Sequence, residues 1–124
     1  TIIGNVTTNS NHLAFAGNGD IVINSGSVFT IDNNDLTFNN NQTIRGEGKL
    51  VVGTGLIASG KTLTTFASVE VGTDATTINV GELVVNGGTF TYNNTKTLNK
   101  LTVNSGATFA AAASTTEQDA QAQQ

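Results

Sequence analysis

The chain has 124 residues, enough for one domain with a core of modest width, and it contains no cysteine, proline or tryptophan. Only 11% of the residues are charged, the formal net charge is -4, and the five basic residues are scattered along the chain. This charge argues against nucleic acid as a partner, which needs clustered lysine and arginine, and it provides no basic patch for an anionic membrane. Disulfides and thiolate metal sites are excluded because there is no cysteine.

Residues 1–20 begin with an apolar pair, Ile2-Ile3, followed by a polar stretch rich in threonine and asparagine. Residues 13–15 are expected to form a first, partial strand, so we interpret this segment as an N-terminal strand or edge. His12 is the only histidine, which leaves no support for a catalytic triad or a histidine-based metal site. We expect it to be an ordinary loop residue.

From residue 21 onward one phrase of about nine residues recurs, and its clearest form is Leu-Thr-Val-Asn-Ser-Gly-Ala-Thr-Phe at 101–109. Copies of this phrase begin at Ile21, Leu36, Leu50, Val69, Leu83 and Leu101. The first and third positions are apolar and point to the same face of a strand, so they are expected to be buried together. Asn or Gly follows at the positions where the chain must turn, since these residues enter the left-handed region most easily. The predicted corner positions are Asn24, Gly26, Asn39, Asn41, Gly53, Gly55, Gly72, Asn86, Gly88, Asn104 and Gly106.

Strand, corner and strand in repetition predict an all-β protein, and stacked copies would form a parallel β-solenoid of about six short coils over residues 21–113. Neutral amides and hydroxyls suit such a stack, because ladders of like charge would repel. The alternative is an antiparallel β-sandwich, since Asn18-Gly19 and Asn86-Gly87 also suit two-residue hairpin turns. The sandwich explains each turn singly but gives no reason for six copies of one phrase.

Residues 114–124 are a polar tail of alanine and glutamine that follows a run of alanines. Ser114 and Glu117 have the spacing of a capping box, but too few residues follow for a stable isolated helix. We therefore expect the tail to be flexible or docked on a partner. The chain begins without methionine, which leaves open a removed leader or a piece of a longer protein.

No strong capping segment is visible at either end of the expected solenoid, so either the chain is cut from a longer solenoid or subunits stack end to end. End-to-end stacking would produce a homo-oligomer or a filament. The second position of each copy should face outward, and there Val22, Val51 and Val84 suggest an apolar stripe, although β-propensity alone also explains them. The possible interface residues are Ile2, Ile3, Val22, Val51, Val84 and Phe109.

Candidate chemistry is sparse. Residues 32–35 and 18–20 offer oxygens for Ca²⁺ but match no calcium motif, so we interpret them as turns. Glu47, Glu70 and Glu82 could supply a carboxylate pair for glycoside cleavage only if the fold brought two of them together. Threonine pairs such as Thr62/Thr64 and Thr89/Thr91 do not recur at one fixed position, so an ice-binding array is not implied. We predict no enzyme, no cofactor and no metal.

Residues 81–90 and 101–111, together with 48–57, resemble the repeats of autotransporter passenger domains and related bacterial surface adhesins. This resemblance implies a right-handed parallel β-helix that is exported to the surface of a Gram-negative cell, usually for adhesion to a glycan or receptor on a host or neighbouring cell. We therefore expect a non-enzymatic extracellular structural or adhesive protein that does not insert into a membrane. The alternative is a polysaccharide-binding or polysaccharide-cleaving β-helix of tailspike or lyase type.

Overall fold

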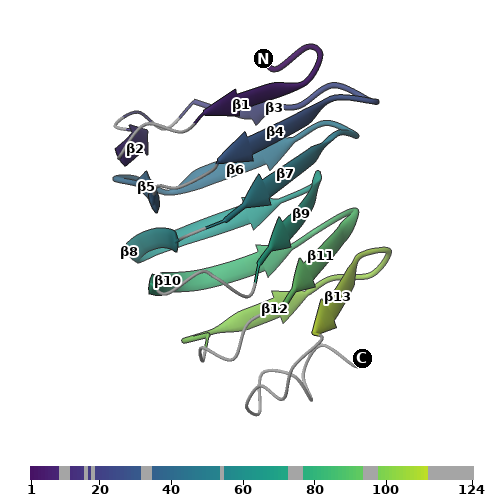
Figure 1. Cartoon of the computed structure of the whole chain (residues 1–124). Helices are drawn as coiled ribbons and strands as arrows, with labels where there is room; N and C mark the ends of the chain where they lie inside the picture. Colours follow the sequence, from purple (N-terminus) through teal and green to yellow (C-terminus); the bar gives the residue numbers. More distant parts are fainter. Residues whose placement is uncertain are drawn as a thin grey trace.

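The computed structural model describes residues 1–8, 12–15, 17, 19–31, 35–53, 55–72, 77–93 and 98–111, and within these ranges all regular structure is β (Figure 1). The predicted tail at 114–124 lies outside them. In chain order the strands are β1 (Val6–Thr8), β2 (His12–Phe15), β3 (Ile21–Val22), β4 (Val28–Ile31), β5 (Asp35–Phe38), β6 (Gln42–Arg45), β7 (Lys49–Val52), β8 (Gly55–Thr65), β9 (Ser68–Val71), β10 (Thr77–Val85), β11 (Thr89–Tyr92), β12 (Leu101–Val103) and β13 (Thr108–Ala111).

The strands form two sheets in which every pairing is parallel. The six-stranded sheet has the order β1-β4-β7-β9-β11-β13. The seven-stranded sheet covers two sides of the coil. On one side β2 pairs with β5, and β5 pairs with the first half of β8. On the other side β3 pairs with β6, and β6 pairs with the second half of β8. The chain therefore winds round three sides per turn, and the predicted β-solenoid is confirmed. An antiparallel sandwich is excluded because none of these pairings is antiparallel.

One turn takes 19 to 23 residues, as the register of the six-stranded sheet shows: Val6, Phe29, Leu50, Val69, Phe90 and Phe109 lie in one column. Four complete turns, β2–β4, β5–β7, β8–β9 and β10–β11, lie between the partial turns of β1 and β12–β13. The expectation of about six coils was too high, because the copies that begin at Leu36 and Leu50 lie in the same turn and the copy at Leu101 lies in a partial turn. Each side of the coil needs the same apolar-x-apolar strand and the same corner.

The copies of the phrase consequently do not all stack on one another. Leu83 pairs with Leu101 in the seven-stranded sheet, whereas Leu50 and Val69 pair in the six-stranded sheet. Residues 1–20, interpreted as a separate edge segment, contribute β1 and β2 to these same two sheets. The first strands are therefore part of the solenoid.

The core is a single column of apolar side chains enclosed by the coil. Strands alternate between buried and half-buried residues, as in β7, where Leu50 and Val52 point inward. Aromatic rings stack between turns, with centroids 5.5 Å apart for Phe15 and Phe38 and 5.8 Å apart for Phe90 and Phe109. Each fully buried large apolar side chain contributes roughly 1.5–3 kcal/mol, so stability is distributed along the stack.

Corners of different length keep the strands in register. Two residues separate β8 from β9, whereas five separate β3 from β4. At the corner between β6 and β7, Gly46 has φ +99°, and a Cβ there would lie 2.1 Å from the carbonyl oxygen of Ile23 in the preceding turn. Gly26 has a similar φ of +78°, but a Cβ at this position would meet nothing within 4 Å.

Comparing substitutions at Gly26 and Gly46 distinguishes the cost of backbone strain from the cost of a steric clash with the preceding turn. Gly26→Ala is expected to lower the free energy of unfolding by about 1–2 kcal/mol, the cost of a left-handed residue with a side chain. Gly46→Ala is expected to cost at least about 1 kcal/mol more, because its Cβ also displaces the preceding turn. Denaturant unfolding of both variants checks this, and equal losses would contradict it.

Thr65 provides a second stability prediction. Its side chain is 0% exposed between Ile44 and Val85, and its hydroxyl has no hydrogen-bond partner among the described residues. Thr65→Val should raise the free energy of unfolding by about 1 kcal/mol, because it removes an unsatisfied hydroxyl and keeps the shape. The half-exposed neighbour Thr64 is the control, and Thr64→Val should change stability by less than about 0.5 kcal/mol. A destabilised Thr65→Val variant would refute the assignment.

Candidate functional site

The predicted corner residues lie mostly between strands. Most of them lie at corners, either in the turns that precede β4, β6, β11 and β13 or directly after β7 and β9. These residues are Asn24, Gly26, Asn39, Asn41, Gly53, Gly72, Asn86, Gly88, Asn104 and Gly106. Gly26, Gly88 and Gly106 have positive φ. Gly55 differs, since it is the buried first residue of β8.

Polar corner side chains hold adjacent turns together. Asn41 Oδ1 accepts a hydrogen bond from the Thr62 backbone N–H at 2.9 Å, and Asn104 Nδ2 donates to Asn86 Oδ1. Ser68 Oγ accepts from the Thr89 backbone N–H at 3.2 Å. These groups bind the next turn of the same chain, so they are not free for a ligand.

A column of small residues occupies the corner beside the six-stranded sheet, two positions before each inward residue of that sheet. Its members are Gly4, Ser27, Gly48, Ala67, Gly88 and Ala107. The turns approach closely here: the Lys49 N–H donates to the Ser27 carbonyl at 3.0 Å, and a Cβ on Gly48 would lie 2.4 Å from Ile23 Cγ2. Sequence reasoning missed this column because turn lengths vary. Measuring backward from each inward apolar residue would have found it.

The three outward valines do not form one apolar stripe. Val51 lies in the six-stranded sheet between Thr30 and Glu70. Val84 lies in the seven-stranded sheet between Thr64 and Thr102, and Val22 pairs with Arg45. All three are half-buried, but their neighbours in register are polar or charged. β-propensity on a pleated surface explains them.

The remaining interface candidates fall into two groups. Ile2 and Ile3 lie at the N-terminal end of the stack, where Ile2 is half-buried and Ile3 is 74% exposed. Phe109 was expected at an open end, yet it is only 6% exposed and packs against the rings of Phe90 and Tyr92. The two ends of the described stack therefore differ in how much apolar surface they expose.

The three candidate glutamates lie on different parts of the coil. Glu70, on β9, is paired with Lys49 Nζ at 2.7 Å, and Glu82, on β10, lies 3.8 Å from Lys100 Nζ. Glu47 is in the corner between β6 and β7. A shallow hollow beside this corner is lined by Gly26, Ser27, Val28, Glu47, Gly48, Lys49 and Ser68. It contains one carboxylate, whereas glycoside cleavage by this route requires two.

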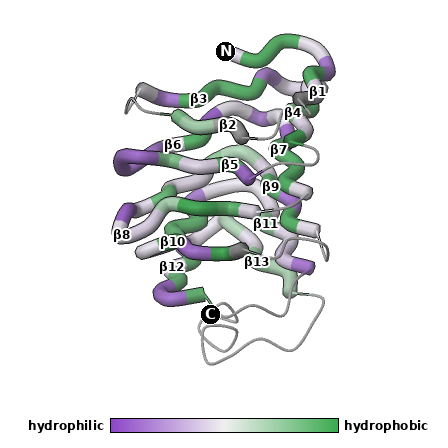
Figure 2. Tube along the Cα trace, turned by 60° about the vertical axis from the view of Figure 1, so that its left-hand side comes forward, coloured by the Kyte–Doolittle hydropathy of each residue, from purple (hydrophilic) through white to green (hydrophobic). Residues whose placement is uncertain are grey.

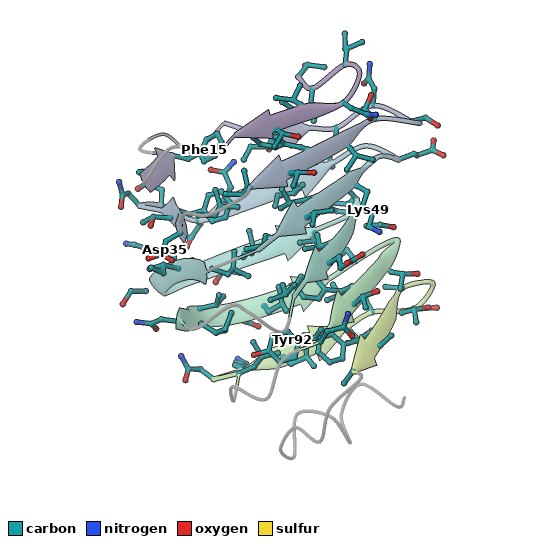
Figure 3. All side chains as sticks on the ribbon, viewed as in Figure 1. Phe15, Asp35, Lys49 and Tyr92 are labelled. Carbon is teal, nitrogen blue, oxygen red and sulfur yellow. The ribbon has the colours of Figure 1, made fainter. Side chains whose placement is uncertain are left out.

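Other polar candidates are also separated. Asp35 starts β5, on the opposite side of the molecule from Lys49 (Figure 3), and Asp20 pairs with Arg45 at 2.5 Å. Residues 18 and 32–34 lie outside the described residues, as does the side chain of His12, whose backbone lies in β2. In the described ranges there is no group of three His, Cys, Asp or Glu side chains that could hold a metal ion.

One exposed cluster links three successive turns. Arg45 Nε donates to Asp20 Oδ2, and the Arg45 guanidinium lies 4.7 Å from the centroid of the Phe66 ring. The carboxylate and the aromatic face thus both engage the same cation. Such exposed contacts contribute up to about 1 kcal/mol each, so the cluster ties turns together.

No protein-family model, curated protein or solved structure matches the chain. Among the described residues, no helix has the length and apolar character needed to cross a membrane. The site must therefore be interpreted from its own geometry.

Tyr92 is the chain's one tyrosine and is fully buried near the last turns (Figure 3). Burial raises its pKa from the usual 10.0 to about 12, because the charged phenolate loses its hydration. In the unfolded chain Tyr92 would ionise at its usual, lower pKa. Its contribution to the free energy of unfolding is therefore fully present below pH 10 and is lost as the pH rises toward 12.

Two measurements check this. The tyrosinate absorbance of the folded protein should have its midpoint near pH 12, and the free energy of unfolding should fall between roughly pH 9 and pH 11.5. Tyr92→Phe is the control, since its stability should fall less steeply over that range. A midpoint near pH 10 in folded protein would contradict the burial argument.

Proposed function

We propose that this chain is a non-enzymatic, exported structural or adhesive module, in which the rigid coil is itself the working part. The observation that carries the proposal is the uninterrupted parallel register from β1 to β13, which makes the stack one continuous body. The coil is inferred to be right-handed, because parallel strands joined across a sheet are connected with that hand in nearly all proteins. The proposed location is the cell surface.

The outer faces support a role in contact more than in catalysis. Outward positions of the six-stranded sheet include Thr30, Thr89 and Thr91, whose side chains are neutral hydrogen-bonding groups on a regular surface. Such a surface suits a carbohydrate or receptor on a host or neighbouring cell, or another copy of the chain. A polysaccharide-cleaving role is not favoured, since Glu70 and Glu82 lie on different sheets and each faces a lysine.

The proposal is tested on the purified chain in two ways. Sedimentation and negative-stain microscopy over a range of concentrations should reveal specific assemblies larger than a monomer. Binding to a panel of surface glycans and to cells should occur without turnover of the polysaccharide. A monomer at every concentration that also binds no glycan or cell would refute the proposal. So would polysaccharide cleavage that is lost in Glu70→Gln or Glu82→Gln.

A further inference from the structure

One corner of the coil carries a sequence that can modify itself. Asn86 and Gly87 follow β10, and together with Gly88 they form the corner that leads into β11 at Thr89. An asparagine followed by glycine can cyclise, because glycine has no side chain to hinder attack by its own backbone nitrogen on the asparagine amide. β8, β10 and β12 follow one another down the stack, as do β9, β11 and β13, so this corner lies between two others (Figure 2).

The folded corner holds both reacting groups in other hydrogen bonds. The backbone N–H of Gly87 donates to the Thr65 carbonyl of the preceding turn at 3.2 Å, and the N–H of Asn86 donates to the same carbonyl at 2.8 Å. On the other side, Asn86 Oδ1 accepts a hydrogen bond from Asn104 Nδ2 of the following turn. The nitrogen that would attack is therefore bonded to one neighbouring turn, and the amide that it would attack is bonded to the other.

The corner also has no room for a longer backbone. A Cβ on Gly87 would lie 2.9 Å from the Phe66 carbonyl oxygen, and a Cβ on Gly88 would lie 2.9 Å from the Ser68 backbone nitrogen. Both ends of the corner are fixed by the parallel pairing of β10 with β8 and of β11 with β9. An additional backbone atom would therefore have to displace the preceding turn or break the register of a flanking strand.

We propose that Asn86-Gly87 is a self-modification site that the wound coil protects and the unwound chain exposes. In the unwound chain the Gly87 nitrogen loses its proton and attacks Asn86 Cγ. A carbon–nitrogen bond forms, and the side-chain nitrogen leaves as ammonia together with that proton, which produces a cyclic imide. Water opens the imide either at the bond to Cγ, which gives aspartate, or at the bond to the main-chain carbonyl carbon of Asn86, which gives isoaspartate and a backbone longer by a single atom.

The two products have opposite consequences for the fold. Aspartate keeps the length of the backbone, and its carboxylate oxygen accepts the hydrogen bond from Asn104 as the amide oxygen does. Isoaspartate lengthens the corner against Phe66 and Ser68, so a chain that carries it does not regain the native register. Prompt winding thus preserves the site, whereas a chain that stays unwound acquires a mark that prevents winding. This inference is independent of the proposed function.

The protection is tested on the full chain in mildly alkaline buffer, either folded or unfolded in urea. Asn18 also precedes a glycine, so Asn18→Gln is included in every sample. Trypsin cleavage after Lys61 and Lys96 releases residues 62–96, and mass spectrometry of this peptide measures conversion at position 86 and distinguishes the two products. Conversion should be at least roughly a hundredfold slower in the folded chain, because the corner must open first. Comparable rates in the two samples would overturn the protection.

Refolding after the unfolded incubation tests the consequence. Chains with isoaspartate at position 86 should not regain the native circular dichroism spectrum and thermal midpoint, whereas Asn86→Asp should fold with a native spectrum. Asn86→Gln is the matched control, because its longer side chain closes a ring less readily, and it should refold fully after the same incubation. A native midpoint in the isoaspartate fraction, or an Asn86→Asp variant that does not fold, would overturn the assigned consequences. Loss of refolding in Asn86→Gln would place the damage at another position and overturn them as well.

Discussion

The parallel backbone ladder between successive turns is the interaction on which the structure depends. Each strand bonds to its counterpart one turn earlier and one turn later, and the corners absorb differences in turn length. This explains how turns of 19 to 23 residues share one register. It also explains why glycine is required where a corner touches the preceding turn, as at Gly46, and is less constrained where the corner is open, as at Gly26.

Side chains follow the same spacing and reinforce it. The ion pairs Asp20–Arg45, Lys49–Glu70 and Glu82–Lys100 each join consecutive turns. Aromatic rings stack along the interior, and corner amides bond to the turn beside them. Polar groups that might otherwise form a site are thus used between turns. This is consistent with a protein whose function lies in its surfaces and ends.

The ends acquire particular importance in such an architecture. A solenoid exposes apolar interior and strand edge only where the stack stops, and among the described residues the most exposed large apolar side chain is that of Ile3, close to β1. An expectation of end-to-end filaments treats the two ends as equivalent. Among the described residues the two differ, since Phe109 is 6% exposed and Ile3 is 74% exposed.

The sequence by itself determined the all-β class, the parallel stacking and many corner positions, because alternating apolar residues followed by Asn or Gly are local signals. Leu83 over Leu101 is the direct result of that pattern. Only the tertiary structure decided which side of the coil each copy occupies, because a strand and corner look alike on every side. For the same reason Leu50 was expected in one stack with Leu83 but lies in the other sheet. The small-residue corner column and the burial of Phe109 depend on turn lengths and contacts between distant residues, which no local pattern specifies.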